Sequence, residues 1–323
     1  MRAWVLRQYG EPHEALSLEE VPDPVPGPGQ VVVAVEAAGL AFPDLLRVRG
    51  EYQVTQPLGT APGSELVGRV RSCGPGTSLA PGTRVMGTTQ IGDGSLAELA
   101  LLRETDACPV PDDLPAAVGA TLTANYSIAH HALNTRAQVR PGEVVVVNGG
   151  AGGVGSAAIQ LAKAAGARVL ADDVGAERAQ ACLDFGADAG VDTSHEDLTA
   201  AIMAFSEDRG ADVVIDTVGG DVFVACRRAI ASEGRIVVVG FTGGEIPQLK
   251  VNQLILRNFT VMGVNGFFYS DRFGDVMHHL LDLYLRGSIA PPIEKEYAFT
   301  DAPTVLTRIG ARQVRGRAVV LVG

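Results

Sequence analysis

The sequence predicts an α/β protein in which a doubly wound parallel sheet is joined to a β-rich module. In the middle of the chain, apolar runs alternate with amphipathic segments, which is typical of a parallel sheet covered by helices. These runs lie at 143–148, 167–172, 189–192, 211–217, 235–240 and 259–264. The preceding part instead has short strand candidates between turns rich in proline and glycine, at 31–35, 66–70 and 84–86.

The end of the chain indicates that the β-rich module is discontinuous. Residues 316–322 form a strand candidate with no further strand–helix–strand unit to join. We therefore expect this strand to return to the first module. The predicted domains are 1–123 with 264–323, and 124–263.

Composition excludes several classes of protein. A length of 323 residues with 46% hydrophobic residues supports two domains with large cores. The net charge of −11 argues against nucleic acid or an anionic membrane as a partner. The first residues contain no apolar signal segment, and no apolar run reaches ~18 residues, so we expect a cytoplasmic protein. The cysteines have no C-x-x-C spacing and are expected to be reduced thiols, at 73, 108, 182 and 226.

The apolar run at 143–148 ends in a glycine-rich turn. The glycines at 150, 152 and 155 match G-x-G-x-x-G, and an apolar helical face follows up to Gly166. In this motif the glycines allow a tight turn, the approach of a pyrophosphate, and close packing of the helix on the strand. The candidate phosphate-binding residues are Gly150, Gly152, Gly153, Val154 and Gly155.

The second strand of this region ends in two acidic residues, Asp172 and Asp173. Asp173 lies 18 residues after Gly155. This is close to the ~20 residues at which an acidic side chain binds the adenosine ribose of a dinucleotide. The sequence therefore predicts a dinucleotide-binding domain.

Motifs on both sides of the glycine loop resemble one family. Residues 39–52 are similar to "G-x-N-x-x-D…G-x-Y", and residues 62–68 are similar to "P-G-x-E-x-x-G". In this order they resemble the medium-chain dehydrogenase/reductase superfamily, in its zinc-free quinone oxidoreductase (zeta-crystallin-like) branch. The resemblance implies a GroES-like β domain interrupted by a Rossmann domain, and a homodimer or tetramer joined through the Rossmann domains. It also implies cofactor contacts at Thr123, Thr217, Gly219, Gly240 and Phe241.

The chain departs from the zinc-dependent members of this superfamily at the metal ligands. The corresponding positions are Ala41, Ser64 and Ala120, which offer no thiolate or imidazole. The histidine pairs 130–131 and 278–279 are adjacent in sequence, so on a helix their side chains point to different sides. We therefore expect no zinc site.

Without a Lewis acid, the easier acceptors are those that delocalise the arriving charge. The resemblance thus implies an NAD(P)H-dependent reductase of quinones or α,β-unsaturated carbonyls. An enoyl-thioester (2-enoyl-CoA or acyl-carrier) reductase is the alternative enzyme, with Arg47 and Arg49 as the nearby basic residues. These arginines suit a solvated strand edge equally well. An alternative of another class is an NAD(P)H-binding sensor or crystallin-like protein with little turnover.

The resemblance also suggests roles for side chains in the first module. Tyr52, eight residues after Asp44, corresponds to the presumed proton donor of related enoyl-thioester reductases, and equally suits a packed aromatic. Asp44 is expected to accept backbone N–H groups in its turn. Glu65 is expected to pair with an arginine. Thr123 is interpreted as a nicotinamide contact, a helix N-cap, or both.

The cofactor prediction depends on three side chains. The branch usually binds the 2′-phosphate of NADPH with a lysine, and Arg178 stands at that position. Asp172 and Asp173 would repel the same phosphate. Because direct repulsion at the ribose outweighs one flexible arginine, the prediction is NADH over NADPH.

Overall fold

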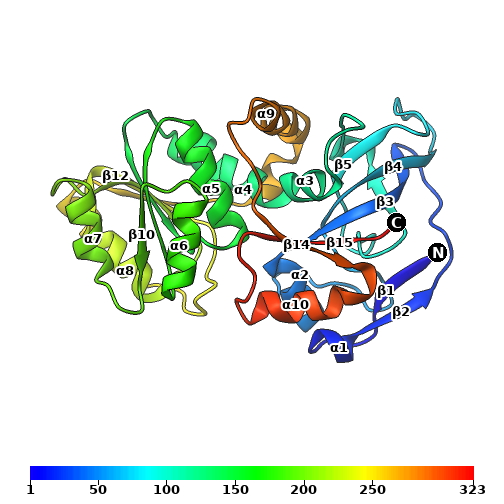
Figure 1. The fold of residues 1–323 in the computed structure, drawn as a ribbon, viewed down its shortest axis with the longest axis horizontal. Helices are drawn as coiled ribbons and strands as arrows, with labels where there is room; N and C mark the ends of the chain where they lie inside the picture. The colour runs from blue at the N-terminus through cyan, green and yellow to red at the C-terminus, as the bar shows by residue number, and fades with distance from the viewer. The chain divides into compact units, whose positions relative to one another are not determined.

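The computed structural model describes residues 1–323 and divides the chain into two compact units. Unit 1 comprises Met1–Ala124, Ser270–Leu281 and Ile293–Gly323, and unit 2 comprises Asn125–Tyr269 and Asp282–Pro292. The chain thus leaves unit 1, builds unit 2 and returns (Figure 1). The structure assigns 264–269 and 282–292 to unit 2, whereas the sequence placed them in the first module.

Unit 2 contains a six-stranded parallel sheet. Its order is β10-β9-β8-β11-β12-β13, so β8 lies where the strand order reverses. This is the doubly wound arrangement that the alternating apolar runs predicted. The strands are β8 (Val144–Asn148), β9 (Arg168–Asp173), β10 (Ala189–Asp192), β11 (Ala211–Asp216), β12 (Ile230–Val238) and β13 (Thr260–Gly263).

Helices cover both faces of this sheet because its strands are apolar on both sides. Val146, Leu170 and Val214 share a core with the helices α7 and α8. The alternate side chains of β8 point to the opposite face, where α5 packs on β8 and β9. The helices are α4 (Ser127–His130), α5 (Gly153–Ala164), α6 (Ala176–Asp184), α7 (Leu198–Phe205) and α8 (Gly220–Arg228), with short helical turns at η3 (His131–Ala137), η4 (Val251–Leu256) and η5 (Gly266–Arg272).

Unit 1 is built around a seven-stranded sheet and a separate two-stranded hairpin, β1–β2. The sheet order is β14-β15-β3-β4-β5-β7, and β6 also pairs with β3. The C-terminal strand β15 runs antiparallel to β3, which confirms that the end of the chain returns to the first module. The strands are β1 (Arg2–Leu6), β2 (Leu16–Glu20), β3 (Gln30–Leu40), β4 (Glu65–Cys73), β5 (Arg84–Thr88), β6 (Leu99–Arg103), β7 (Ala107–Pro109), β14 (Ile293–Ala298) and β15 (Arg317–Leu321).

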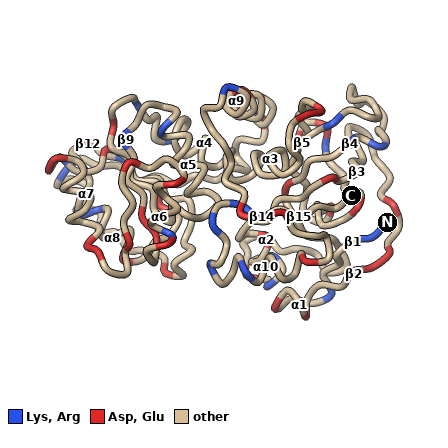
Figure 2. The backbone as a smooth tube through the Cα atoms, viewed as in Figure 1, with Lys and Arg blue, Asp and Glu red and all other residues tan.

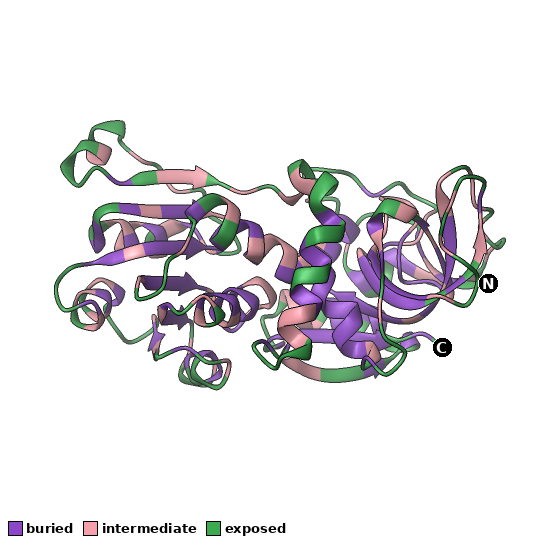
Figure 3. Ribbon diagram, turned by 90° about the horizontal axis from the view of Figure 1, so that it is seen from above, coloured by how far each residue is buried: buried purple, intermediate pink, exposed green.

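The strands of both sheets are mostly buried, while helices and loops carry the exposed residues (Figure 3). Acidic and basic positions are interspersed over both units (Figure 2). The helices that unit 1 contributes are α1 (Pro12–Ala15), η1 (Glu104–Asp106), α2 (Phe42–Arg49), α3 (Ala116–Thr121), η6 (Phe299–Asp301) and α10 (Ala302–Gly310). Three elements contain residues of both units: η2 (Leu122–Tyr126), η5 (Gly266–Arg272) and α9 (Phe273–Leu285).

The segment that carries Arg47 and Arg49 is a helix, so its interpretation as a strand edge was wrong. Asp44 Oδ2 accepts the backbone N–H of Ala41 at 2.9 Å, which stabilises the first turn of α2. This contact confirms the predicted role of Asp44. The helix ends at Gly50, whose φ is +75°, and a Cβ there would lie 2.9 Å from Tyr9 Cγ, so a side chain is disfavoured at this position.

Candidate functional site

The glycine loop of unit 2 connects β8 to α5 and has the geometry of a phosphate seat. A Cβ on Gly155 would lie 2.1 Å from the carbonyl oxygen of Gly149, and one on Gly150 would lie 2.7 Å from the Cys182 sulfur. These two glycines therefore let the helix and the loop pack closely. A Cβ on Gly152 would meet only Gly149 O, at 3.3 Å, so this side of the loop is open.

The first turn of α5 has free donors for an anion. Its N-cap is Gly152, and no side chain caps the turn. The N–H groups of Gly153, Val154 and Gly155 belong to the orphan donors of a helix N-terminus, which favours phosphate binding. The loop therefore fits the diphosphate of a dinucleotide.

Asp173 and Arg178 form one unit at the end of β9. Arg178 Nε and Nη2 donate to the two carboxylate oxygens of Asp173, at 2.9 and 3.1 Å. Asp173 Oδ2 also accepts the N–H of Ala151, at 3.0 Å. Asp173 thus connects the strand end to the glycine loop and holds Arg178 in place.

Asp172 faces the interior of unit 2. Its side chain is 1% exposed, and it accepts an N–H bond from Gly149. Burial, together with the nearby carboxylates of Asp173 and Asp216, raises the pKa of Asp172 well above its usual range. One oxygen each of Asp172 and Asp216 is buried without a hydrogen-bond partner. Asp172 is therefore a core carboxyl under the loop.

The other cofactor-contact residues predicted in unit 2 lie at the carboxyl ends of its parallel strands. Thr217 Oγ1 donates to Asn148 O at 2.8 Å, and Gly219 N donates to Asp216 Oδ1 at 3.0 Å. Gly240 N donates to Asp216 O at 3.3 Å, and Phe241 Cδ1 lies 3.1 Å from the position of a Cβ on Gly219. The structure therefore gathers these residues around the ends of β8, β11 and β12.

Thr123 and Glu65 are joined inside unit 1. Thr123 lies within the π-helical turn η2, so its interpretation as an N-cap was wrong. Its Oγ1 donates to Glu65 Oε2 at 3.1 Å, and Ala124 N donates to the same oxygen at 2.9 Å. The other Glu65 oxygen forms an ion pair with Arg317. The predicted pairing of Glu65 with an arginine is confirmed.

The Glu65–Arg317 pair has almost no contact with water. Glu65 is 0% and Arg317 1% exposed. Burial lowers the pKa of Arg317 to about 10, against the opposing effect of the Asp44 carboxylate, so the guanidinium stays charged at neutral pH. Arg317 was not identified from the sequence. A single charged residue at the start of the apolar strand 317–321 could have indicated it.

The positions of the zinc ligands hold groups of another kind. Ala41 and Ala120 have no donor atom, and the Ser64 hydroxyl lies between Arg47 and Asp44. Nowhere in residues 1–323 do three His, Cys, Asp or Glu side chains come together to hold a metal ion. The donor set therefore does not fit zinc.

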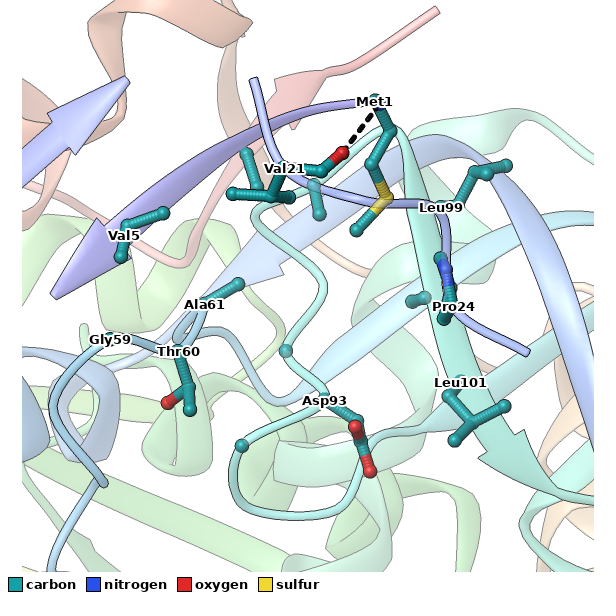
Figure 4. A pocket seen from close by; sticks show the side chains of 15 residues that line it. Met1, Val5, Val21, Pro24, Gly59, Thr60, Ala61, Asp93, Leu99 and Leu101 are labelled. Carbon is teal, nitrogen blue, oxygen red and sulfur yellow. Dashed lines mark hydrogen bonds between the residues drawn. The ribbon is translucent and has the colours of Figure 1, made fainter. Parts of the chain in front are cut away.

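A hollow of unit 1 lies near the N-terminus and shares no residue with the side-chain clusters described above. It encloses about 160 Å³, and Asp93 has the only ionisable side chain in its lining (Figure 4). Burial raises the pKa of Asp93. Separately, none of the helices has the length and apolar character needed to cross a membrane.

Comparisons with known proteins agree with this geometry. Residues 27–112 match the family model described as "Alcohol dehydrogenase GroES-like domain", and residues 153–282 match "Zinc-binding dehydrogenase". The chain belongs to the medium-chain dehydrogenase/reductase superfamily, an oxidoreductase family with a GroES-like and a Rossmann domain.

Individual relatives define the branch. A quinone oxidoreductase-like protein 2 homolog of Nematostella vectensis is 35% identical, over 99% of this chain and 88% of its own. A probable oxidoreductase of Mycobacterium abscessus has a TM-score of 0.89 at 34% identity, covering 100% of this chain and 99% of its own. A mycobacterial protein solved with NADPH has a TM-score of 0.91 at 27% identity, with 100% of both chains covered. Within the superfamily, the chain is an enzyme of the quinone oxidoreductase type.

Replacing one partner of the buried ion pair should destabilise unit 1. In Glu65→Gln the Arg317 charge stays buried and unpaired, which costs about 3–5 kcal/mol. Urea unfolding followed by the fluorescence of Trp4, the single tryptophan, reports on this unit. The double variant Glu65→Gln/Arg317→Met should recover most of the loss. A single variant as stable as the parent would show that the pair contributes nothing.

The difference in unfolding free energy between Asp172→Asn and the parent should shift in favour of the variant as pH rises. Above the ordinary aspartate pKa of about 4 the unfolded chain loses a proton that folded Asp172 keeps, so the stability of the parent falls as pH rises. The amide in the variant Asp172→Asn does not titrate, so this loss of stability is absent from the variant. Its stability advantage should therefore grow with pH, by up to about 1.4 kcal/mol per pH unit. Denaturant titrations between pH 5 and pH 9 measure the difference, and a constant difference would contradict the assignment.

Proposed function

We propose that the chain is a zinc-independent, NAD(P)H-dependent oxidoreductase that transfers a hydride to a quinone or an α,β-unsaturated carbonyl. One observation carries the proposal. The dinucleotide loop of unit 2 is complete, while the positions at which related enzymes bind zinc hold Ala41, Ser64 and Ala120. The enzyme therefore binds a hydride donor but has no thiolate or imidazole for a Lewis acid.

A hydride donor without a metal ion favours acceptors that spread negative charge over a conjugated system. A bound nicotinamide supplies the hydride, and the protein supplies position and electrostatics. Because no metal would hold an alkoxide, hydrogen-bond donors must stabilise the oxygen that becomes negative. Quinones and conjugated carbonyls need the least of this stabilisation.

The contact residues predicted from the sequence belong to this proposal. The N–H groups at the start of α5 hold the diphosphate, and Thr217, Gly219, Gly240 and Phe241 contact the rest of the dinucleotide. Thr123 remains a proposed contact of the nicotinamide end, where its oxygen would accept, because its proton is directed to Glu65. Tyr52 is the proposed proton donor through its phenol oxygen.

The arrangement of Asp173 and Arg178 supports NADH as the preferred cofactor. Arg178 already donates two hydrogen bonds to the Asp173 carboxylate, which offsets part of the attraction between the arginine and a 2′-phosphate. The phosphate would then lie close to the Asp173 carboxylate. The ribose hydroxyls of NADH carry no such penalty. The cofactor preference needs a direct test, because the mycobacterial relative was solved with NADPH.

Steady-state kinetics with both cofactors test the proposal. We expect turnover with quinones or conjugated enones and a higher kcat/KM for NADH. Asp173→Ser should shift the ratio toward NADPH by tenfold or more, while Asp184→Ser on the exposed side of α6 should leave it unchanged. Tyr52→Phe should lower turnover 10²- to 10⁴-fold if the phenol is the acid.

The outcomes of this panel separate the alternatives. Activity confined to 2-enoyl-CoA would identify an enoyl-thioester reductase. Stoichiometric NAD(P)H binding without turnover of any acceptor would overturn the proposed function in favour of a sensor or crystallin-like protein. A large preference for NADPH would overturn the NADH assignment.

We also propose that two copies associate through unit 2. Strand β13 is the last strand of its sheet, so its outer edge has no partner strand. Large apolar side chains lie close in sequence, with Val251, Ile255 and Leu256 75–80% exposed. Unpaired edges and exposed apolar groups of this kind favour pairing with another chain.

Light scattering coupled to gel filtration measures this association. The parent should elute as a dimer or tetramer, and Leu256→Lys should shift it toward the monomer. The matched substitution Leu183→Lys, at another exposed leucine of unit 2, should not. A monomeric parent at micromolar concentration would contradict the proposal.

A further inference from the structure

Four polar and aromatic side chains of unit 1 form a group around helix α2. This α2 cluster consists of Asp44, Arg47, Tyr52 and Ser64. Arg47 Nη1 donates to the Ser64 hydroxyl at 2.6 Å, and that hydroxyl donates to Asp44 Oδ1. The Arg47 guanidinium also lies over the Tyr52 ring, 5.0 Å from its centroid. The cluster therefore holds one arginine in a fixed orientation.

The guanidinium of Arg47 is buried but incompletely bonded. The residue is 8% exposed, and its Nε is buried without a hydrogen-bond partner. Its nearest carboxylate, Asp44, lies 3.6 Å from Nη1. Nη1 is directed to Ser64, whereas Nη2 donates to no group of the chain and is not among the fully buried atoms. Nη2 is thus the donor that an incoming ligand can reach.

Asp44 does not neutralise Arg47 completely. One of its oxygens accepts the N–H of Ala41 and the other accepts the Ser64 hydroxyl. Its charge also acts on the buried Arg317. Because a desolvated guanidinium with an unused donor gains strongly from a negative oxygen, this position favours an anion.

We propose that Arg47 makes the α2 cluster a binding site for a ligand with an anionic oxygen. Such an oxygen would accept a hydrogen bond from Arg47 Nη2, and Asp44, Ser64 and Tyr52 would hold the guanidinium in place beforehand. A carboxylate is the simplest ligand of this kind.

A ligand-binding arginine and a purely structural arginine at position 47 would behave differently. A structural arginine would affect the stability of α2 but not the discrimination between a charged and a neutral ligand. Arg49 is the matched control on the same helix, because it pairs with the exposed Glu11 and lies outside the cluster.

Binding of benzoate and benzamide tests the proposal. The two probes have similar shape, but only benzoate is an anion. Calorimetry on the full chain should show benzoate binding at least tenfold more tightly than benzamide. Arg47→Gln should abolish the difference, Arg47→Lys should retain part of it, and Arg49→Gln should retain all of it. NADH titration by fluorescence should give unchanged affinity in every variant, which shows that unit 2 remains folded.

Equal benzoate binding in the parent and Arg47→Gln would overturn the proposal. If Arg47→Gln does not fold, Arg47→Lys decides in the same way, through loss or retention of part of the tenfold preference. The measurement requires no turnover, so its outcome is independent of the proposed function.

Discussion

The buried pair of Glu65 and Arg317 connects three distant parts of unit 1. Glu65 begins β4, Arg317 begins the C-terminal strand β15, and the second oxygen of Glu65 holds the turn that contains Thr123. Gly39 lies between them, since a Cβ there would be 2.9 Å from Arg317 Nη2 and 2.1 Å from Ala120 O. Because the charges have no access to water, each partner depends on the other. The pair therefore stabilises both the C-terminal strand in unit 1 and the turn that contains Thr123.

Unit 2 contains buried polar side chains beneath the glycine loop and the turn after β11. Asn148 Nδ2 donates to Asp216 Oδ1 at 3.1 Å, and the Cys226 thiol donates to Asn148 Oδ1 at 3.3 Å. Together with Asp172, these groups support the backbone of the glycine loop and of the turn after β11. Burial, with the nearby carboxylates of Asp172 and Asp216, raises the pKa of the Cys226 thiol, so this cysteine is a neutral core residue. A buried polar layer thus holds in place the backbone donors of the proposed phosphate site.

The α2 cluster includes Ser64, one of the positions at which the sequence was compared with the zinc ligands of the superfamily. This serine connects an arginine to an aspartate, so a fixed positive charge lies beside it. From the sequence, Arg47 was considered only as a basic residue near an enoyl-thioester site or on a solvated strand edge, and was not connected to Ser64. In a helix, Arg47 lies three residues after Asp44, on the same side.

The sequence by itself determined the strands of unit 2 and the glycine loop. Periodicity and turn residues report these features directly, since they depend on neighbours in the chain. The return of the C-terminal strand was inferred because no further strand–helix–strand unit was left for it to join. Only the tertiary structure decided that Asp172 is buried while Asp173 binds Arg178, that Glu65 pairs with Arg317, and that Arg47 joins Ser64. Ion pairs between distant segments depend on how sheets and helices pack, and a linear pattern does not record that packing.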